Sequence, residues 1–67
     1  MPHSIQGAID WLEDHGWRLR EIKDRECRIF HHPTDTTKKG KVVTVLGALD
    51  APLTQGQWRN IQEQADG

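Results

Sequence analysis

Hydrophobic periodicity changes twice along this chain, and the two changes limit the folds open to it. Residues 4–15 and a last segment from Thr54 repeat apolar side chains at helical spacing. Between them, residues 17–46 contain short alternating or β-branched runs that are typical of strands. A chain of 67 residues has room for one small core, because a domain of this size buries only about 60% of its unfolded surface. We therefore expect a single domain, 1–67.

Residues that favour helix ends stand at the borders of both helical segments. Ser4 is placed to cap the first helix at its start, and Gly16 is placed to end it in a left-handed conformation. Thr54 and Gln57 have the spacing of a capping box at the start of the last helix. These signals predict two helices that enclose the strand region.

Three strands are expected between the helices, over residues 17–22, 27–32 and 41–46. In the first, Trp17 and Leu19 should face the core and Arg18 should face away, until the alternation breaks at Glu21. The order α-β-β-β-α predicts an α+β fold, in which a three-stranded antiparallel sheet carries both helices on one face.

Strand parity gives expectations for the other two strands. Cys27 shares its side of the strand with Ile29, which favours inward packing of this cysteine as a small hydrophobe. If the third strand turns Val43 and Val45 inward, then Val42 and Leu46 face out, with Phe30 beside them. Such an exposed apolar strip would suit a protein partner. A register shifted by one residue would invert this assignment.

Composition excludes several classes of function. The net charge of −1 does not by itself indicate a nucleic-acid-binding protein. One cysteine allows neither an internal disulfide nor a thiolate zinc site, and a reducing, cytoplasmic location is the simplest interpretation. No long apolar run and no secretory signal are visible, so we expect no membrane segment. Nothing in the sequence indicates a metal or another cofactor.

Basic residues gather in the middle of the chain. On the strands and their connections they could contact the phosphates of RNA, which proteins recognise largely by shape. The alternative is a solvated surface of mixed charge, because Glu21, Asp24 and Glu26 are interleaved with them. The candidate RNA-binding residues are Arg18, Arg20, Lys23, Arg25, Arg28, Lys38, Lys39 and Lys41.

Three residues could carry chemistry. His31 and His32 end the second strand, where adjacent side chains point to opposite faces and cannot jointly bind a metal. Either histidine could act as a general acid or base, although a structural role beside Pro33 is the simpler interpretation. Cys27 would need a neighbouring base or a lowered pKa to act as a nucleophile.

Five segments together form a familiar pattern, and they are Leu12-Glu13-Asp14-His15-Gly16-Trp17, Ile29-Phe30-His31-His32-Pro33, Val43-Thr44-Val45, Leu53-Thr54-Gln55-Gly56-Gln57-Trp58-Arg59-Asn60-Ile61 and Gln64-Ala65. Their order and spacing resemble the HicA family of small toxins from toxin–antitoxin systems, over nearly the whole chain. The resemblance implies a double-stranded-RNA-binding-like fold, cleavage of mRNA and neutralisation by a partner antitoxin.

The catalytic region of that family is not matched here. Cleavage in the family depends on a histidine at the start of the second strand, just after a Gly-Ser step. The Gly-Ser positions align with Arg25 and Glu26, and the histidine position aligns with Cys27 or Arg28. The resemblance therefore favours a HicA-like domain that binds RNA or an antitoxin-like protein and lacks the family's catalytic histidine. The alternatives are a protein-interaction module that uses the open sheet face and a nuclease with relocated residues.

Overall fold

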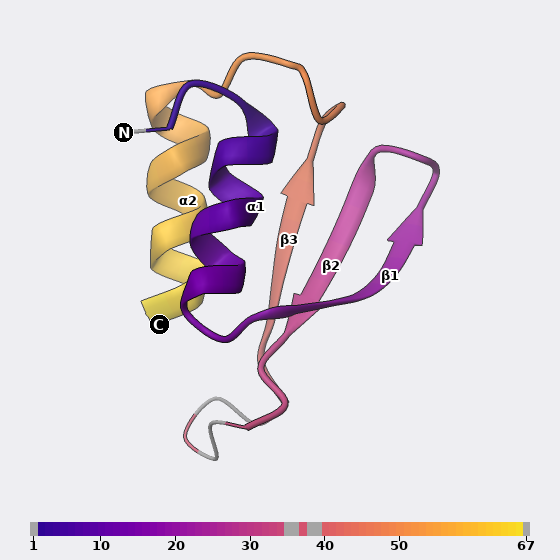
Figure 1. Cartoon of the computed structure of the whole chain (residues 1–67), viewed down its shortest axis with the longest axis vertical. Helices are drawn as coiled ribbons and strands as arrows, with labels where there is room; N and C mark the ends of the chain where they lie inside the picture. Colours follow the sequence, from indigo (N-terminus) through magenta and orange to yellow (C-terminus); the bar gives the residue numbers. More distant parts are fainter. Residues whose placement is uncertain (1, 35–36, 38–39, 67) are drawn as a thin grey trace.

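Two helices lie against one side of a three-stranded antiparallel sheet (Figure 1). The computed structural model describes residues 2–34, 37 and 40–66. The elements are α1 (Ile5–Asp14), β1 (Arg18–Lys23), β2 (Cys27–His31), β3 (Val42–Leu46) and α2 (Gln55–Asp66). The expected α-β-β-β-α order and α+β class are confirmed. Strand order in the sheet is β1-β2-β3, so β1 and β3 are its edges.

The predicted helix caps are present. Ser4 Oγ accepts a hydrogen bond of 3.3 Å from the Gly7 N–H at the start of α1. Gly16 follows α1 with a φ of +91°, which glycine adopts without the steric cost of a side chain. Before α2, the Gln57 N–H donates to Thr54 Oγ1, and the Thr54 N–H donates back to Gln57 Oε1, both at 3.1 Å. The reciprocal pair is the capping box that the sequence predicts.

A bulge interrupts the pairing of β1 with β2. Leu19 pairs with Phe30 and Glu21 pairs with Ile29, so Arg20 is an extra residue on β1. The break in alternation predicted at Glu21 is thereby confirmed. The second and third strands are each one residue shorter than expected, because β2 ends at His31 and β3 begins at Val42.

The core lies between the sheet and the helices and draws on every element except β1. Trp17, just before β1, is completely buried. Trp11 and Trp58 pack against the core from its rim with their rings edge to face, 5.0 Å apart. The buried residues are Ile5, Ala8, Ile9, Leu12, Trp17, Phe30, Val43, Val45, Leu53, Ile61 and Ala65.

The expected parity of β2 is wrong. Phe30 is 1% exposed and pairs with buried Val43, so it faces the helices. Cys27 and Ile29 therefore lie on the opposite face and are half-buried. Apolar residues occur on both faces of β2. The phenyl ring of Phe30 removes more apolar area from water than the side chain of Cys27 or of Ile29 does. This larger burial explains why the face with Phe30 turns toward the helices.

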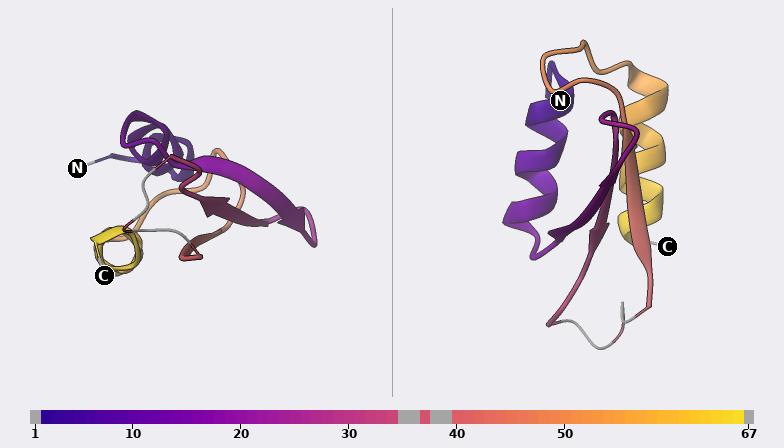
Figure 2. Two further views of the ribbon diagram at one scale, coloured as in Figure 1. Left: turned by 90° about the horizontal axis from the view of Figure 1, so that it is seen from below. Right: turned by 90° about the vertical axis from the view of Figure 1, so that its right-hand side faces the viewer.

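The prediction that Leu19 packs in the core is also wrong. Leu19 pairs with Phe30 and shares the helix-facing side, yet it is 48% exposed. The hairpin of β1 and β2 extends away from the helices, which leave β1 uncovered (Figure 2). On β3 the expectations are confirmed, since Val43 and Val45 are buried while Val42 and Leu46 are exposed.

Candidate nucleic-acid interface

The hairpin between β1 and β2 projects from the body of the molecule (Figure 2). Its tip runs through Asp24 and Arg25, with φ of 53° and 68°. Lys23 pairs with Cys27, so the connection is three residues long, and its first two residues adopt the left-handed conformation that few residues with a side chain adopt. The Gly47 N–H donates to Glu26 O at 2.9 Å, which fastens the tip to the end of β3. The tip is thus held from the side of β3.

Three of the expected phosphate-binding residues are on this hairpin and are available to a ligand. Arg20 is at the bulge, Lys23 ends β1 and Arg25 is at the tip. All three are exposed. Within the described part of the chain, none of the three is held by a hydrogen bond or an ion pair. Their charges are therefore free to meet phosphates at no cost in broken contacts.

Two other candidate arginines bind the protein itself. Arg18 Nη1 donates to Glu13 O at 3.0 Å and to Trp17 O at 2.9 Å, next to the end of α1. Arg28 is half-buried on the helix-facing side, where its Nη1 donates to Gly47 O at 3.1 Å. Both guanidiniums satisfy carbonyl groups, so their first role is structural.

The remaining candidate lysines are distant from the tip or outside the described residues. Lys41 is exposed and comes just before β3, at the end of the sheet opposite the tip. Lys38 and Lys39 lie outside the described residues. The structure therefore divides the predicted basic set, and only Arg20, Lys23 and Arg25 are both on the hairpin and unengaged.

The histidines have different positions. His32 Nε2 donates to His15 O at 2.8 Å, and its ring stands edge to face with Trp17 at 5.3 Å. His15 Nδ1 donates in turn to Trp11 O at 2.8 Å. Two imidazoles thus satisfy carbonyls at the end of α1. His31 is half-buried on the open sheet face, beside Val42.

Cys27 has no histidine near it on its strand. It lies opposite Lys23 at the start of β2, whereas His31 is four residues further along, about 13 Å away. His32 is engaged at the end of α1. The arrangement does not provide the thiol with the adjacent base that a nucleophilic cysteine requires.

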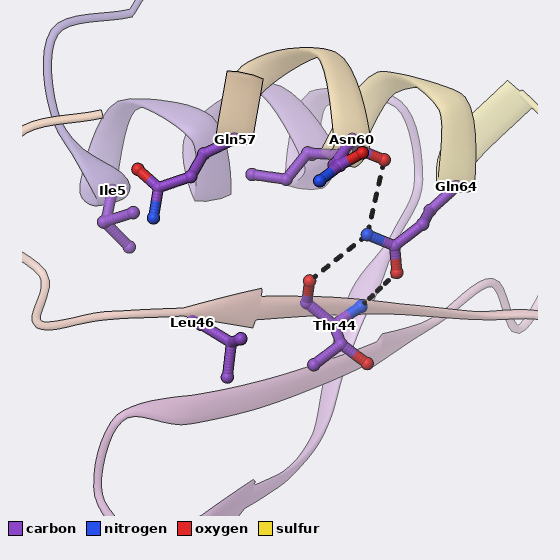
Figure 3. Close-up of a pocket in the computed structure, with 7 residues that line it drawn as sticks. Ile5, Thr44, Leu46, Gln57, Asn60 and Gln64 are labelled. Carbon is purple, nitrogen blue, oxygen red and sulfur yellow. Dashed lines mark hydrogen bonds between the residues drawn. The ribbon is translucent and has the colours of Figure 1, made fainter. Parts of the chain in front are cut away.

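A groove between α2 and β3 was not anticipated from the sequence. Its volume is about 200 Å³. Gln64 of α2 closes one end, where Oε1 accepts from the Thr44 N–H at 2.9 Å and Nε2 donates to Thr44 O at 3.4 Å (Figure 3). The Gln64 amide thereby satisfies the backbone N–H and C=O of Thr44 on the edge strand β3. The lining residues are Ile5, Thr44, Leu46, Gln57, Asn60, Ile61 and Gln64.

Exposed aliphatic residues lie on both edge strands. Leu19 and Ile22 are on β1, while Val42 and Leu46 are on β3. In contrast, the described aromatic residues Trp11, Trp17, Phe30 and Trp58 are buried or half-buried. Val42 and Leu46 lie on the open face, whereas Leu19 and Ile22 lie on the helix-facing side. The open face therefore offers aliphatic contacts and no tryptophan or phenylalanine of the described residues on which bases could stack.

No family model, curated protein or solved structure matches this chain. Among the described residues, no group of three histidine, cysteine or carboxylate side chains is arranged to hold a metal ion. None of the helices in the described ranges has the length and apolar character needed to cross a membrane. The candidate surfaces of the described residues are therefore the hairpin and the two edge strands.

Proposed function

We propose that this chain is a HicA-like domain of a toxin–antitoxin pair, which binds RNA through its β1–β2 hairpin and does not cleave it by a histidine-dependent route. The observation that carries the proposal is the set of three unengaged cations, Arg20, Lys23 and Arg25, on one projecting hairpin. The α-β-β-β-α order, which the resemblance to the HicA family implies, supports it. Fold alone would not, because one fold serves many functions.

The chemistry of such a site is electrostatic. Cations that neutralise phosphates release the counterions condensed on RNA, and this release makes binding favourable and dependent on salt. Glu21, Asp24 and Glu26 lie on the same hairpin and weaken the positive potential. We therefore expect modest affinity without sequence preference.

Fluorescence anisotropy with a short labelled single-stranded RNA tests this proposal. The variant Arg20→Gln/Lys23→Gln/Arg25→Asn should bind at least about tenfold more weakly at low salt. Its plot of log affinity against log salt should be shallower by about 2, since each lost phosphate contact on a single strand removes about 0.7.

Arg59→Gln is the matched control, because Arg59 is an exposed arginine on α2 rather than on the hairpin. It should leave the affinity unchanged. Absence of binding by the unaltered chain at low salt would exclude the RNA proposal. Equal affinity of the triple variant would show that the hairpin is the wrong surface.

A second candidate function is binding of a protein partner through the sheet. The exposed aliphatic residues Val42 and Leu46 favour it, since aliphatic side chains on an open face suit a protein better than a phosphate backbone. Val42→Lys and Leu46→Lys should abolish binding of an antitoxin-like partner, and they should leave binding of RNA through the hairpin intact.

A further inference from the structure

Strand β1 is an edge strand that carries a bulge at Arg20 and several charged residues, and no other element of the described chain covers its edge. All six of its residues are exposed, and neither helix extends over it (Figure 2). Leu19 and Ile22 are 48% and 51% exposed on the helix-facing side. Exposed edge strands with apolar side chains readily accept another strand, because their outer N–H and C=O groups are unpaired.

The backbone groups that point outward can be assigned from the ladder. Thr44 presents its N–H and C=O to Gln64, away from β2. Alternation in an antiparallel sheet then directs the backbone of Ile29 toward β1, where Glu21 is its partner. The bulge at Arg20 shifts the alternation by one residue, so Leu19, opposite Phe30, and Ile22 both direct theirs outward. The apolar pair and the free backbone groups therefore belong to the same residues.

The sequence of β1 is complementary to itself when reversed. It reads Arg18-Leu19-Arg20-Glu21-Ile22-Lys23. When two copies run antiparallel with Leu19 opposite Ile22, Arg20 falls opposite Glu21 in both halves. Opposite charges across a strand pair are favourable, and like charges are not. A strand edge that carried only lysines would repel a second copy of itself, whereas the mixed charges of β1 attract one.

We propose that β1 pairs with β1 of a second copy of this chain, which makes a homodimer with a continuous six-stranded sheet. A two-fold axis perpendicular to the sheet passes between Arg20 and Glu21. It places Leu19 of each copy against Ile22 of the other, and all four helices on one side. The interface is isologous, as in most soluble dimers. The inference does not rest on RNA binding, although Arg20 of β1 belongs to both surfaces. Arg25 at the hairpin tip stays outside the interface.

One like-charge pair at each end of the interface is reduced by the fold. The register places Arg18 opposite the partner's Lys23, which would disfavour association. Arg18, however, is directed to the end of α1 by its bonds to Glu13 O and Trp17 O. These bonds hold the guanidinium near the end of α1 rather than over the partner's strand, so the central Arg20–Glu21 pairs set the balance.

Sedimentation equilibrium of the full chain over a wide concentration range tests the dimer. We expect dissociation in the micromolar range, as for a small interface. Glu21→Arg places arginine opposite arginine twice and should weaken the dimer about tenfold or more. The double variant Arg20→Glu/Glu21→Arg restores both opposite-charge pairs and should recover the dimer. Leu46→Lys, on the other edge strand, is the control and should dimerise normally.

Amide hydrogen exchange of the unaltered chain locates the interface. Protection of the Leu19 and Ile22 amides should rise with protein concentration, while that of Thr44 should not change. A chain that stays monomeric at near-millimolar concentration overturns the proposal and leaves β1 to a different protein. A dimer that Glu21→Arg does not weaken, or that the double variant does not recover, overturns it as well.

Discussion

Gly16 is required by two separate features of the structure. Its φ of +91° is disfavoured for any residue with a side chain. A Cβ at this position would also lie 2.6 Å from His32 Nε2, the atom that donates to His15 O. The glycine therefore permits both the exit from α1 and the histidine that satisfies the last carbonyl.

Replacement of Gly16 and of Gly56 by alanine should have opposite effects. Gly16→Ala should lower the free energy of unfolding by about 1–3 kcal/mol, from backbone strain and the displaced imidazole. Gly56 is in the first turn of α2, and a Cβ there would meet nothing within 4 Å. Gly56→Ala should raise it by about 0.5–1 kcal/mol. Urea unfolding measures both, and the same sign for the two would contradict this account.

At the scale of elements, helix α2 covers the sheet and also hydrogen-bonds the backbone of its edge strand β3. Its Gln64 amide makes with Thr44 the two hydrogen bonds that a neighbouring strand would make. The edge of β3 is thus protected at its centre, whereas β1 at the other edge has no such cover. This asymmetry is why the inferred strand pairing is assigned to β1.

The variant Gln64→Leu tests how much this amide contact contributes to stability and to protection of the β3 edge. It leaves the half-buried Thr44 N–H without its acceptor, which should cost about 1–2 kcal/mol of unfolding free energy. The Thr44 amide should also exchange faster with solvent. Gln55→Leu is the matched control on an exposed position of the same helix. Unchanged stability and unchanged Thr44 exchange would show that the amide contact contributes nothing.

For the whole molecule, the fold separates the groups that a histidine-dependent nuclease would need. Cys27 is at one end of β2 and His31 is at the other. His32 is beyond the strand and donates to the end of α1. A general acid or base must lie within hydrogen-bond reach of the proton that it transfers. No two of these three side chains are placed to act together on one phosphate.

The purified chain should therefore leave single-stranded RNA intact, at a rate no higher than that in buffer alone. Its induced expression should not arrest growth. The assay is gel analysis of labelled RNA over time, with His31→Ala and Cys27→Ser measured in parallel. Cleavage that is lost in either variant would show relocated catalytic residues and would refute the proposed absence of activity.

The sequence allowed much of the fold to be predicted, because local signals agree with the tertiary structure. Helix caps at Ser4 and Thr54 and the break in alternation at Glu21 are all local. The parity of β2 could not be predicted, since apolar residues occur on both of its faces. The hairpin cations were identified as candidates, but the engagement of Arg18 and Arg28 depends on carbonyls that the chain brings near only on folding.

By itself, the sequence determined which segments become helices and strands and in what order, because caps, periodicity and turn residues act over a few positions. Tertiary structure decided which face of β2 is buried, how far the helices extend over the sheet and which cations remain free. Those outcomes depend on competition for one small core, which holds Phe30 and leaves Leu19 and Ile22 outside. The same competition leaves β1 exposed. The proposed RNA binding and the proposed dimer both depend on β1 and its hairpin.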